Sequence, residues 1–135
     1  MPKMIFVNLV VADVEKSAAF YEAVGFTRDQ RFSRPGSAAA MTWSDTIAFM
    51  LHSREHFANF TSKTIIDARS SVETLLCLSR DSRAEVDAIV EAARAAGGKA
   101  DPCPTQDHGF MYGWSFYDLD GHHWEVLWMH PNAIQ

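Results

Sequence analysis

The chain has 135 residues, of which 47% are hydrophobic, 12% aromatic and 21% charged. This length and composition are typical of one globular domain with a hydrophobic core, and they exclude long disordered stretches. The net charge is −5 with no block of lysine or arginine, so nothing indicates binding to nucleic acid. No apolar run reaches the roughly 20 residues that a membrane-spanning helix needs, so we expect no membrane partner.

The apolar run near the start of the chain ends at Asp13 and lacks the small-residue cleavage site of a signal peptide. Only two cysteines are present, Cys77 and Cys103, and Cys77 lies inside the apolar run 75–78. We therefore expect a buried free thiol at Cys77 rather than a disulfide. These features predict a cytoplasmic protein.

The first half of the chain begins with a β-favouring apolar run over residues 5–11, which predicts a strand. Asp13 then caps a predicted helix that continues to Val24, where Gly25 ends it. Candidate strands follow at 26–32, 38–43 and 46–52, with turn residues between them.

The second half repeats this order. Residues 74–79 read as a buried strand, and Ser82 with Glu85 forms a capping-box pattern at the start of a helix that Gly97-Gly98 ends. Segments 110–117 and 122–129 then predict a hairpin around a turn that closes with Asp120-Gly121.

The order strand, helix, strands thus occurs twice, which indicates two copies of one supersecondary unit in a single α+β domain over residues 1–135. The two modules cover about residues 1–54 and 70–135. The connection at 53–70 is long for a plain loop, so we expect it to pack on the domain or to carry a short helix.

Four segments resemble the vicinal oxygen chelate superfamily, the glyoxalase, bleomycin-resistance and extradiol dioxygenase group. The segment 6–13, the helix residues 15–21 and the pair Gly25-Phe26 resemble the opening strand and helix of that fold. The segment Asp118-Leu-Asp-Gly-His-His-Trp-Glu125 is similar to the family's closing D-P-D-G-x-x-x-E pattern. The likeness extends over essentially the whole chain.

Three further segments resemble a subgroup of predicted lactoylglutathione-lyase-related proteins. They are Met50-Leu51, Gly109–Gly113 and the ending Trp124–Met129. The subgroup takes its name from its fold, which by itself does not establish chemistry.

The resemblance implies two βαβββ modules whose curved mixed sheets surround a shared cavity, with the helices outside. It also implies four metal-ligand positions on strands that face this cavity. Counted from the family motifs, these positions are held by Phe6, Met50, Leu75 and Glu125. Phe6 and Leu75 cannot bind a metal, and the Met50 thioether is a poor ligand for hard cations. We therefore expect no family metal site, unless other residues rebuild one.

Residues two positions away on the same strands should face the same cavity, because side chains alternate along a strand. These neighbours are Asn8 and Val10, Ala48 and His52, Glu73 and Cys77, and His123 and Leu127. Among them, His52 and His123 are candidates to bind a metal together with Glu125, or to act as acid and base.

Each polar candidate also has a structural interpretation. His52 lies at a strand end and His123 follows a tight turn, where both could face solvent; Glu125 could be exposed or paired. Asn8 lies in an apolar strand and needs a hydrogen-bond partner if it is buried, either a bound ligand or Glu125.

Other histidines are read as surface residues, namely His56, His108, His122 and His130. The aromatic row Phe110, Tyr112, Trp114 and Phe116 should lie on one face of a strand, but periodicity does not decide which face. The chain has four tryptophans, Trp43, Trp114, Trp124 and Trp128, and they are read as core or dimer contacts.

Two functional hypotheses follow. The first is a protein that binds a small apolar or aromatic molecule in a cavity made apolar by Phe6, Met50 and Leu75, with no cofactor. The second is a metal-dependent lyase, isomerase or dioxygenase with ligands drawn from Asn8, His52, His123 and Glu125, for which a divalent metal stays open. An interaction module without ligand is a third hypothesis, and we favour the first.

Other chemistries and the state of assembly can also be assessed from the sequence. There is no glycine-rich phosphate loop, no nucleophile elbow and no Cys-x-x-Cys pair. The four tryptophans and the hydrophobic content exceed what a cavity-bearing monomer buries easily, which predicts a homodimer.

Overall fold

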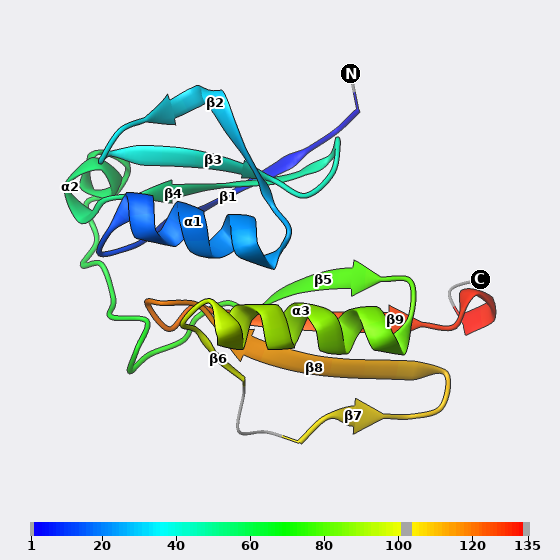
Figure 1. The fold of residues 1–135 in the computed structure, drawn as a ribbon. Coiled ribbons are helices and arrows are strands. Elements are labelled where there is room, and N and C mark those ends of the chain that lie inside the picture. The colour runs from blue at the N-terminus through cyan, green and yellow to red at the C-terminus, as the bar shows by residue number, and fades with distance from the viewer. Residues whose placement is uncertain (1, 101–103, 134–135) are drawn as a thin grey trace. The chain divides into compact units, whose positions relative to one another are not determined.

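The computed structural model describes residues 2–100 and 104–133. The chain divides into two compact units, Met1–Ile66 and Asp67–Gln135. Each unit has its own mixed sheet, with one longer helix packed on that sheet (Figure 1). The predicted α+β class with two βαβββ modules is therefore confirmed, whereas the cavity shared by the modules stays a prediction.

The first unit forms one four-stranded sheet in the order β1-β4-β3-β2. In chain order its elements are β1 (Ile5–Val10), α1 (Val14–Val24), β2 (Thr27–Arg34), β3 (Ala38–Thr42), β4 (Ile47–His52), α2 (Arg54–Phe57) and the 3-10 helix η1 (Ala58–Phe60). Strands β1 and β4 pair in parallel, and the other pairs are antiparallel. The short helices α2 and η1 confirm the expectation for the connecting segment.

Helix α1 begins and ends where the sequence predicts. The Asp13 carboxylate accepts a hydrogen bond from the Lys16 backbone N–H at 3.0 Å, which satisfies one of the free donors of the first turn. Gly25 ends the helix with a φ of 128°, a backbone conformation that residues with a Cβ rarely adopt.

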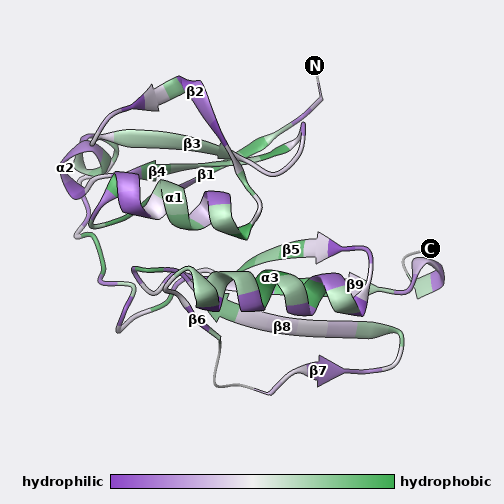
Figure 2. Ribbon diagram, viewed as in Figure 1, coloured by the Kyte–Doolittle hydropathy of each residue, from purple (hydrophilic) through white to green (hydrophobic). Residues whose placement is uncertain are grey.

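The core of the first unit lies between α1 and the sheet. Phe49 of β4 is 2% exposed, and its ring makes edge contacts with the rings of Tyr21 and Phe26. Hydrophobic residues concentrate in β3 and β4, whereas β2 is mostly hydrophilic (Figure 2). Among the described residues of this unit, the opposite face has no long helix packed on it, and only the short helix α2 contacts the ends of β1 and β4.

A charged contact ties α1 to the edge of this sheet. The Glu15 carboxylate accepts hydrogen bonds from Arg28 on β2 at 2.6 and 3.1 Å, and one from the Gly36 N–H at 3.2 Å. The Arg28 bonds, and then the Gly36 bond, lower the pKa of Glu15 from 4.5 to about 2. The folded protein therefore holds Glu15 ionised at pH values where the unfolded chain protonates it.

We expect this contact to contribute to stability above pH 4.5 and to be lost as the pH falls from 4.5 to about 2, because the unfolded chain binds the extra proton in that range. Thermal melts of the wild type and Glu15→Gln should differ at neutral pH and converge near pH 2. Glu73→Gln removes the same charge from an exposed position in the other unit. The difference between its melting temperature and that of the wild type should not shrink as the pH falls to 2. A constant difference between wild type and Glu15→Gln across this range would contradict the prediction.

The second unit forms a sheet in the order β5-β9-β8-β6, with β7 also paired to β8. Its elements are β5 (Leu76–Arg80), α3 (Arg83–Ala95), β6 (Lys99–Ala100), β7 (Gln106–Asp107), β8 (Met111–Tyr117), β9 (His123–Met129) and the 3-10 helix η2 (Pro131–Ala133). Strands β5 and β9 pair in parallel, as β1 and β4 do in the first unit. The two-residue strands β6 and β7 were not predicted.

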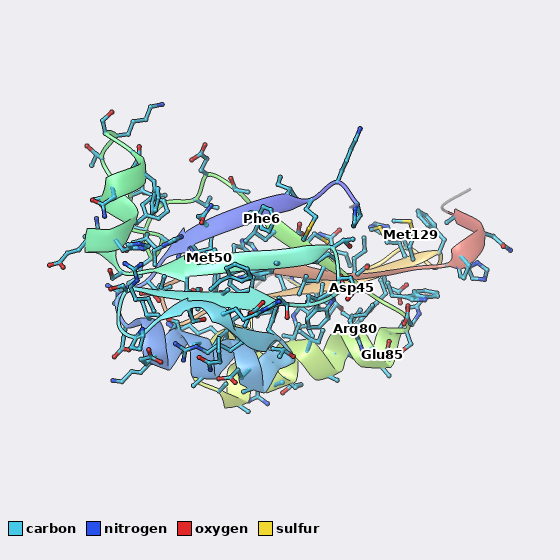
Figure 3. All side chains as sticks on the ribbon, turned by 90° about the horizontal axis from the view of Figure 1, so that it is seen from above. Phe6, Asp45, Met50, Arg80, Glu85 and Met129 are labelled. Atoms are coloured by element: carbon cyan, nitrogen blue, oxygen red, sulfur yellow. The ribbon has the colours of Figure 1, made fainter. Side chains whose placement is uncertain are left out.

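The Ser82 cap of α3 is confirmed, and the Glu85 side chain turns back as in a capping box but bonds Asp81, the residue before the cap. Ser82 Oγ accepts from the Glu85 N–H at 3.1 Å, and the Glu85 carboxylate accepts from the Asp81 N–H at 2.9 Å. The same Glu85 carboxylate also lies 3.3 Å from Arg80 (Figure 3). Two backbone donors at the start of the helix are thereby satisfied, which fixes where the helix leaves β5.

The aromatic row of β8 faces α3. Phe116 is fully buried and stacks on Trp124 of β9. The Tyr112 hydroxyl donates to Asp87 of α3 at 2.6 Å, and the Arg83 guanidinium lies over the Tyr112 ring. Tyr112 and Phe116 therefore lie on the core side of the second sheet, whereas Phe110 precedes β8 and is 54% exposed.

Among the described residues, no helix is long and apolar enough to cross a membrane.

Candidate functional site

The face of the first sheet opposite α1 carries the residues expected to line a cavity. The register pairs Phe6 with Ala48 and Asn8 with Met50, and residues paired in this way point to the same side of a sheet. Phe6 and Met50 lie on neighbouring strands, and Asp45 lies in the hairpin between β3 and β4 (Figure 3).

This face forms a pocket of about 950 Å³ within the first unit. Its floor is made of the small side chains Ala40 and Ala48, and aromatic and thioether side chains form its walls. The apolar wall residues are Met4, Phe6, Phe32, Trp43 and Met50, and the polar ones are Thr27, Asp29, Arg31, Thr42, Ser44 and Asp45. Phe49 also borders the pocket, but its ring packs on the other side of the sheet, against Tyr21. A mainly apolar cavity with a few polar groups is the usual form of a small-molecule site.

Asp29 and Arg31 form the only ion pair among the described residues that line this pocket. The Asp29 carboxylate accepts from the Arg31 Nη2 at 2.8 Å, its Nε at 3.1 Å and its backbone N–H at 3.0 Å. These bonds hold the pKa of the Asp29 carboxyl below its ordinary value. The guanidinium also lies over the Phe32 ring, 5.3 Å from its centroid.

A hydrogen-bonded chain runs across the end of the same face. His52 is only 3% exposed; its Nε2 lies 2.7 Å from Asn8 Oδ1 and its Nδ1 lies 2.8 Å from His56 Nδ1. Because the amide oxygen can only accept, His52 carries its proton on Nε2, and His56 donates from Nδ1. Burial, and then the neighbouring His56 ring, lower the pKa of His52.

This row of hydrogen bonds corrects two interpretations made from the sequence. His52 is buried instead of facing solvent, because Phe57 and Phe60 of the following short helices pack against its ring. His56 is half-buried against His52 instead of lying free on the surface. Asn8 is an exposed residue whose side-chain oxygen is bonded to His52.

The open face of the second sheet carries the other candidates. Cys77 pairs with Glu125, Glu125 with Ser115, and His123 with Tyr117, so these residues share one side of the sheet. A smaller pocket of about 300 Å³ lies here, and Cys77, Ser115, His123 and Glu125 are among its lining residues. Leu75 precedes β5 and is 49% exposed.

The expectation that Cys77 is buried is wrong. Side chains alternate along β5, and its Leu78 points to the core side, where it is 3% exposed. The Cys77 side chain therefore points to the open face, where it is exposed. Partial desolvation, and then the Glu125 charge, raise the pKa of this thiol. The other cysteine, Cys103, lies outside the described residues.

Sequence reasoning missed the contribution of β2 and of the β3–β4 hairpin to the larger pocket. Asp29 and Arg31 are two residues apart on a predicted strand, which was the available signal that they share a face. Their neighbours depend on the register, which places Asp29 opposite Ala40 and Ala40 opposite Met50. A register shift in β2 between Asp29 and Arg34 makes this placement unreadable from the alternation alone.

Solved structures resemble the chain over nearly its whole length. A hypothetical protein from S. aureus is 33% identical with a TM-score of 0.77, covering 94% of both chains. A glyoxalase-related enzyme from Fulvimarina pelagi is 20% identical with a TM-score of 0.76, covering 95% of this chain and 88% of the other. A lactoylglutathione lyase from Agrobacterium tumefaciens is 17% identical with a TM-score of 0.67, covering 95% and 94%.

The last two similarities concern the fold alone, because both identities are low. No curated protein matches the chain. The model of the Glyoxalase/Bleomycin resistance protein/Dioxygenase superfamily matches residues 3–126. The duplicated unit, the open sheet faces and this match over almost the whole chain lead to one conclusion: the chain belongs to the Glyoxalase/Bleomycin resistance protein/Dioxygenase superfamily.

Proposed function

We propose that this family member is a cytoplasmic protein that binds a small apolar or aromatic molecule on the open face of its first sheet. The supporting observation is the pocket of about 950 Å³, whose lining combines the small side chains Ala40 and Ala48 with Phe6, Phe32, Trp43 and Met50. A flat apolar molecule on this floor removes exposed aromatic and thioether surface from water, at about 25 cal/mol for each Å² buried.

The pocket has a practical test. Ala48 lies on the pocket floor, and Ala48→Trp should fill the space that the ligand needs. Calorimetry with the neutral probe 1-naphthylmethanol should give binding that is weaker by about 5- to 150-fold, since overpacking costs about 1–3 kcal/mol. Ala58→Trp makes the same change at an exposed position outside the pocket and should leave binding unchanged. Equal affinity in the wild type and Ala48→Trp would place the ligand elsewhere.

The residues at the family's metal positions do not fit a divalent cation. Phe6 and Leu75 offer no donor atom, and Met50 offers a thioether, which hard cations bind poorly. Within residues 2–100 and 104–133, no three His, Cys, Asp or Glu side chains are grouped so that they could hold a metal ion. Both ring nitrogens of His52 already have partners, so ligation there would break a bond to Asn8 or His56.

We therefore expect protein purified without added metal or chelator to contain well under one equivalent of zinc, nickel, iron or manganese. Elemental analysis of fresh protein measures this directly. Glu125→Gln should leave any trace content unchanged. One equivalent that disappears in His123→Ala would instead establish a rebuilt site with His123 and Glu125, and would favour the lyase, isomerase or dioxygenase hypothesis.

The homodimer also stays a prediction.

A further inference from the structure

The Asp29 carboxylate lies on the wall of the larger pocket with the Arg31 guanidinium folded onto it. Its side chain is 17% exposed, and every hydrogen bond that it accepts among the described residues comes from Arg31. The Arg31 side chain is 80% exposed. Both residues belong to β2, but the Asp29 carboxylate is the more enclosed of the two and the Arg31 guanidinium is largely hydrated.

This asymmetry decides which partner a ligand can replace. If Arg31 swings away, its guanidinium regains water at little cost, because it is already largely hydrated. If Asp29 loses the Arg31 side chain without a substitute, its carboxylate loses two charge-assisted hydrogen bonds, which is unfavourable. A ligand that displaces Arg31 must therefore bring its own positive charge.

The other charged group of the pocket, the Asp45 carboxylate, also favours a cationic ligand. The pocket thus carries two carboxylates and one guanidinium. The net charge of the whole chain is −5, which raises the local concentration of cations and lowers that of anions. A ligand anion would have to compete with Asp29 for Arg31 in the presence of Asp45.

Resting on the proposed function, we propose that the ligand is an aromatic or apolar body carrying a cationic nitrogen, of the amine or amidine class, which takes the place of Arg31 on Asp29. The register puts Asp29 opposite Ala40, and Ala40 opposite Met50. The apolar body then lies over the alanine floor beside Met50 while the cationic group reaches the carboxylate. Asp29 is a specificity-determining residue in this arrangement.

Three probes with one ring system test the charge: 1-naphthylmethylamine as the cation, 1-naphthylmethanol as the neutral analogue and 1-naphthoate as the anion. Calorimetry at pH 7 and low salt should give the order amine, alcohol, anion, from tightest to weakest. Asp29→Asn should weaken binding of the amine by roughly tenfold, because a charge-assisted hydrogen bond is lost, and should leave binding of the alcohol unchanged. Added salt should weaken only the amine.

A second variant keeps the test independent of any folding defect in Asp29→Asn. Arg31→Gln removes the competitor for the carboxylate. It should therefore tighten binding of the amine several-fold and leave binding of the alcohol unchanged. Asp45→Asn makes the same change as Asp29→Asn at an exposed carboxylate of the pocket, and should weaken the amine less because solvent screens that charge.

The outcomes separate the two proposals. If the alcohol binds and the amine binds no better, the pocket function stands and the cationic ligand is wrong. If the anion binds tightest and Arg31→Gln abolishes its binding, Arg31 rather than Asp29 recognises the ligand. If neither the amine nor the alcohol binds, the pocket function itself is wrong.

Discussion

Phe49→Ala should destabilise the first unit by about 3–5 kcal/mol, the usual cost of removing a buried phenylalanine ring. The ring is 2% exposed and contacts the rings of Tyr21 and Phe26 at centroid distances of 4.8 and 5.0 Å. Both partners belong to the layer between α1 and the sheet, so the cavity left behind cannot be filled from solvent. Urea denaturation followed by circular dichroism measures the loss.

Phe32→Ala is the matched control for this experiment. Phe32 is the same residue type on the same sheet, but it is 63% exposed on the open side. Its removal should change the free energy of unfolding by no more than about 0.5 kcal/mol, as is usual for a surface position. Equal losses in the two variants would mean that the buried aromatic layer does not hold this unit together.

Gly121→Ala should destabilise the second unit by about 2–4 kcal/mol, because it adds a backbone clash to an unfavourable backbone conformation. Gly121 has a φ of 93°, and a Cβ at this position would lie 2.8 Å from the Ala68 carbonyl oxygen and 2.9 Å from the Arg69 Cα. Both contacts are with backbone, so no side-chain rotation can relieve them. The turn or the segment before β5 must move.

Gly109→Ala separates the two contributions. Gly109 has a similar φ of 80°, but a Cβ there would meet nothing within 4 Å. It should therefore cost only the conformational share, about 1–2 kcal/mol. The difference between the two variants in thermal or urea unfolding measures the close approach of residues 68–69 to the turn. A difference of zero would show that the clash relaxes freely.

Features set by a few neighbouring residues could be predicted from the sequence. The Asp13 cap, the Gly25 stop and the Ser82 cap each depend on backbone groups within four residues, and all three are confirmed. The same holds for the existence of the longer strands, whose bounds differ from the prediction by one or two residues, but not for the two-residue strands β6 and β7. Local chemistry alone decides these features.

Features that depend on pairing across the sheet could not be predicted. Alternation put Phe6, Asn8 and Met50 on one face, but it could not bring Asp29 beside them, because the register of β2 is shifted. It also could not bury His52, which lies at a strand end and is covered by residues of α2 and η1. Such contacts join residues far apart in the chain, and a one-residue change of register would undo them.

In each unit, the first strand pairs in parallel with the last one, β1 with β4 and β5 with β9. On the ribosome, the nascent first unit has all its strands once His52 has emerged, before any strand of the second unit is made. The second unit lacks the partner of β5 until β9 has emerged, after α3 and β8. The two halves of the gene product therefore mature at different times, and the edge of β5 waits unpaired while the remaining residues are added.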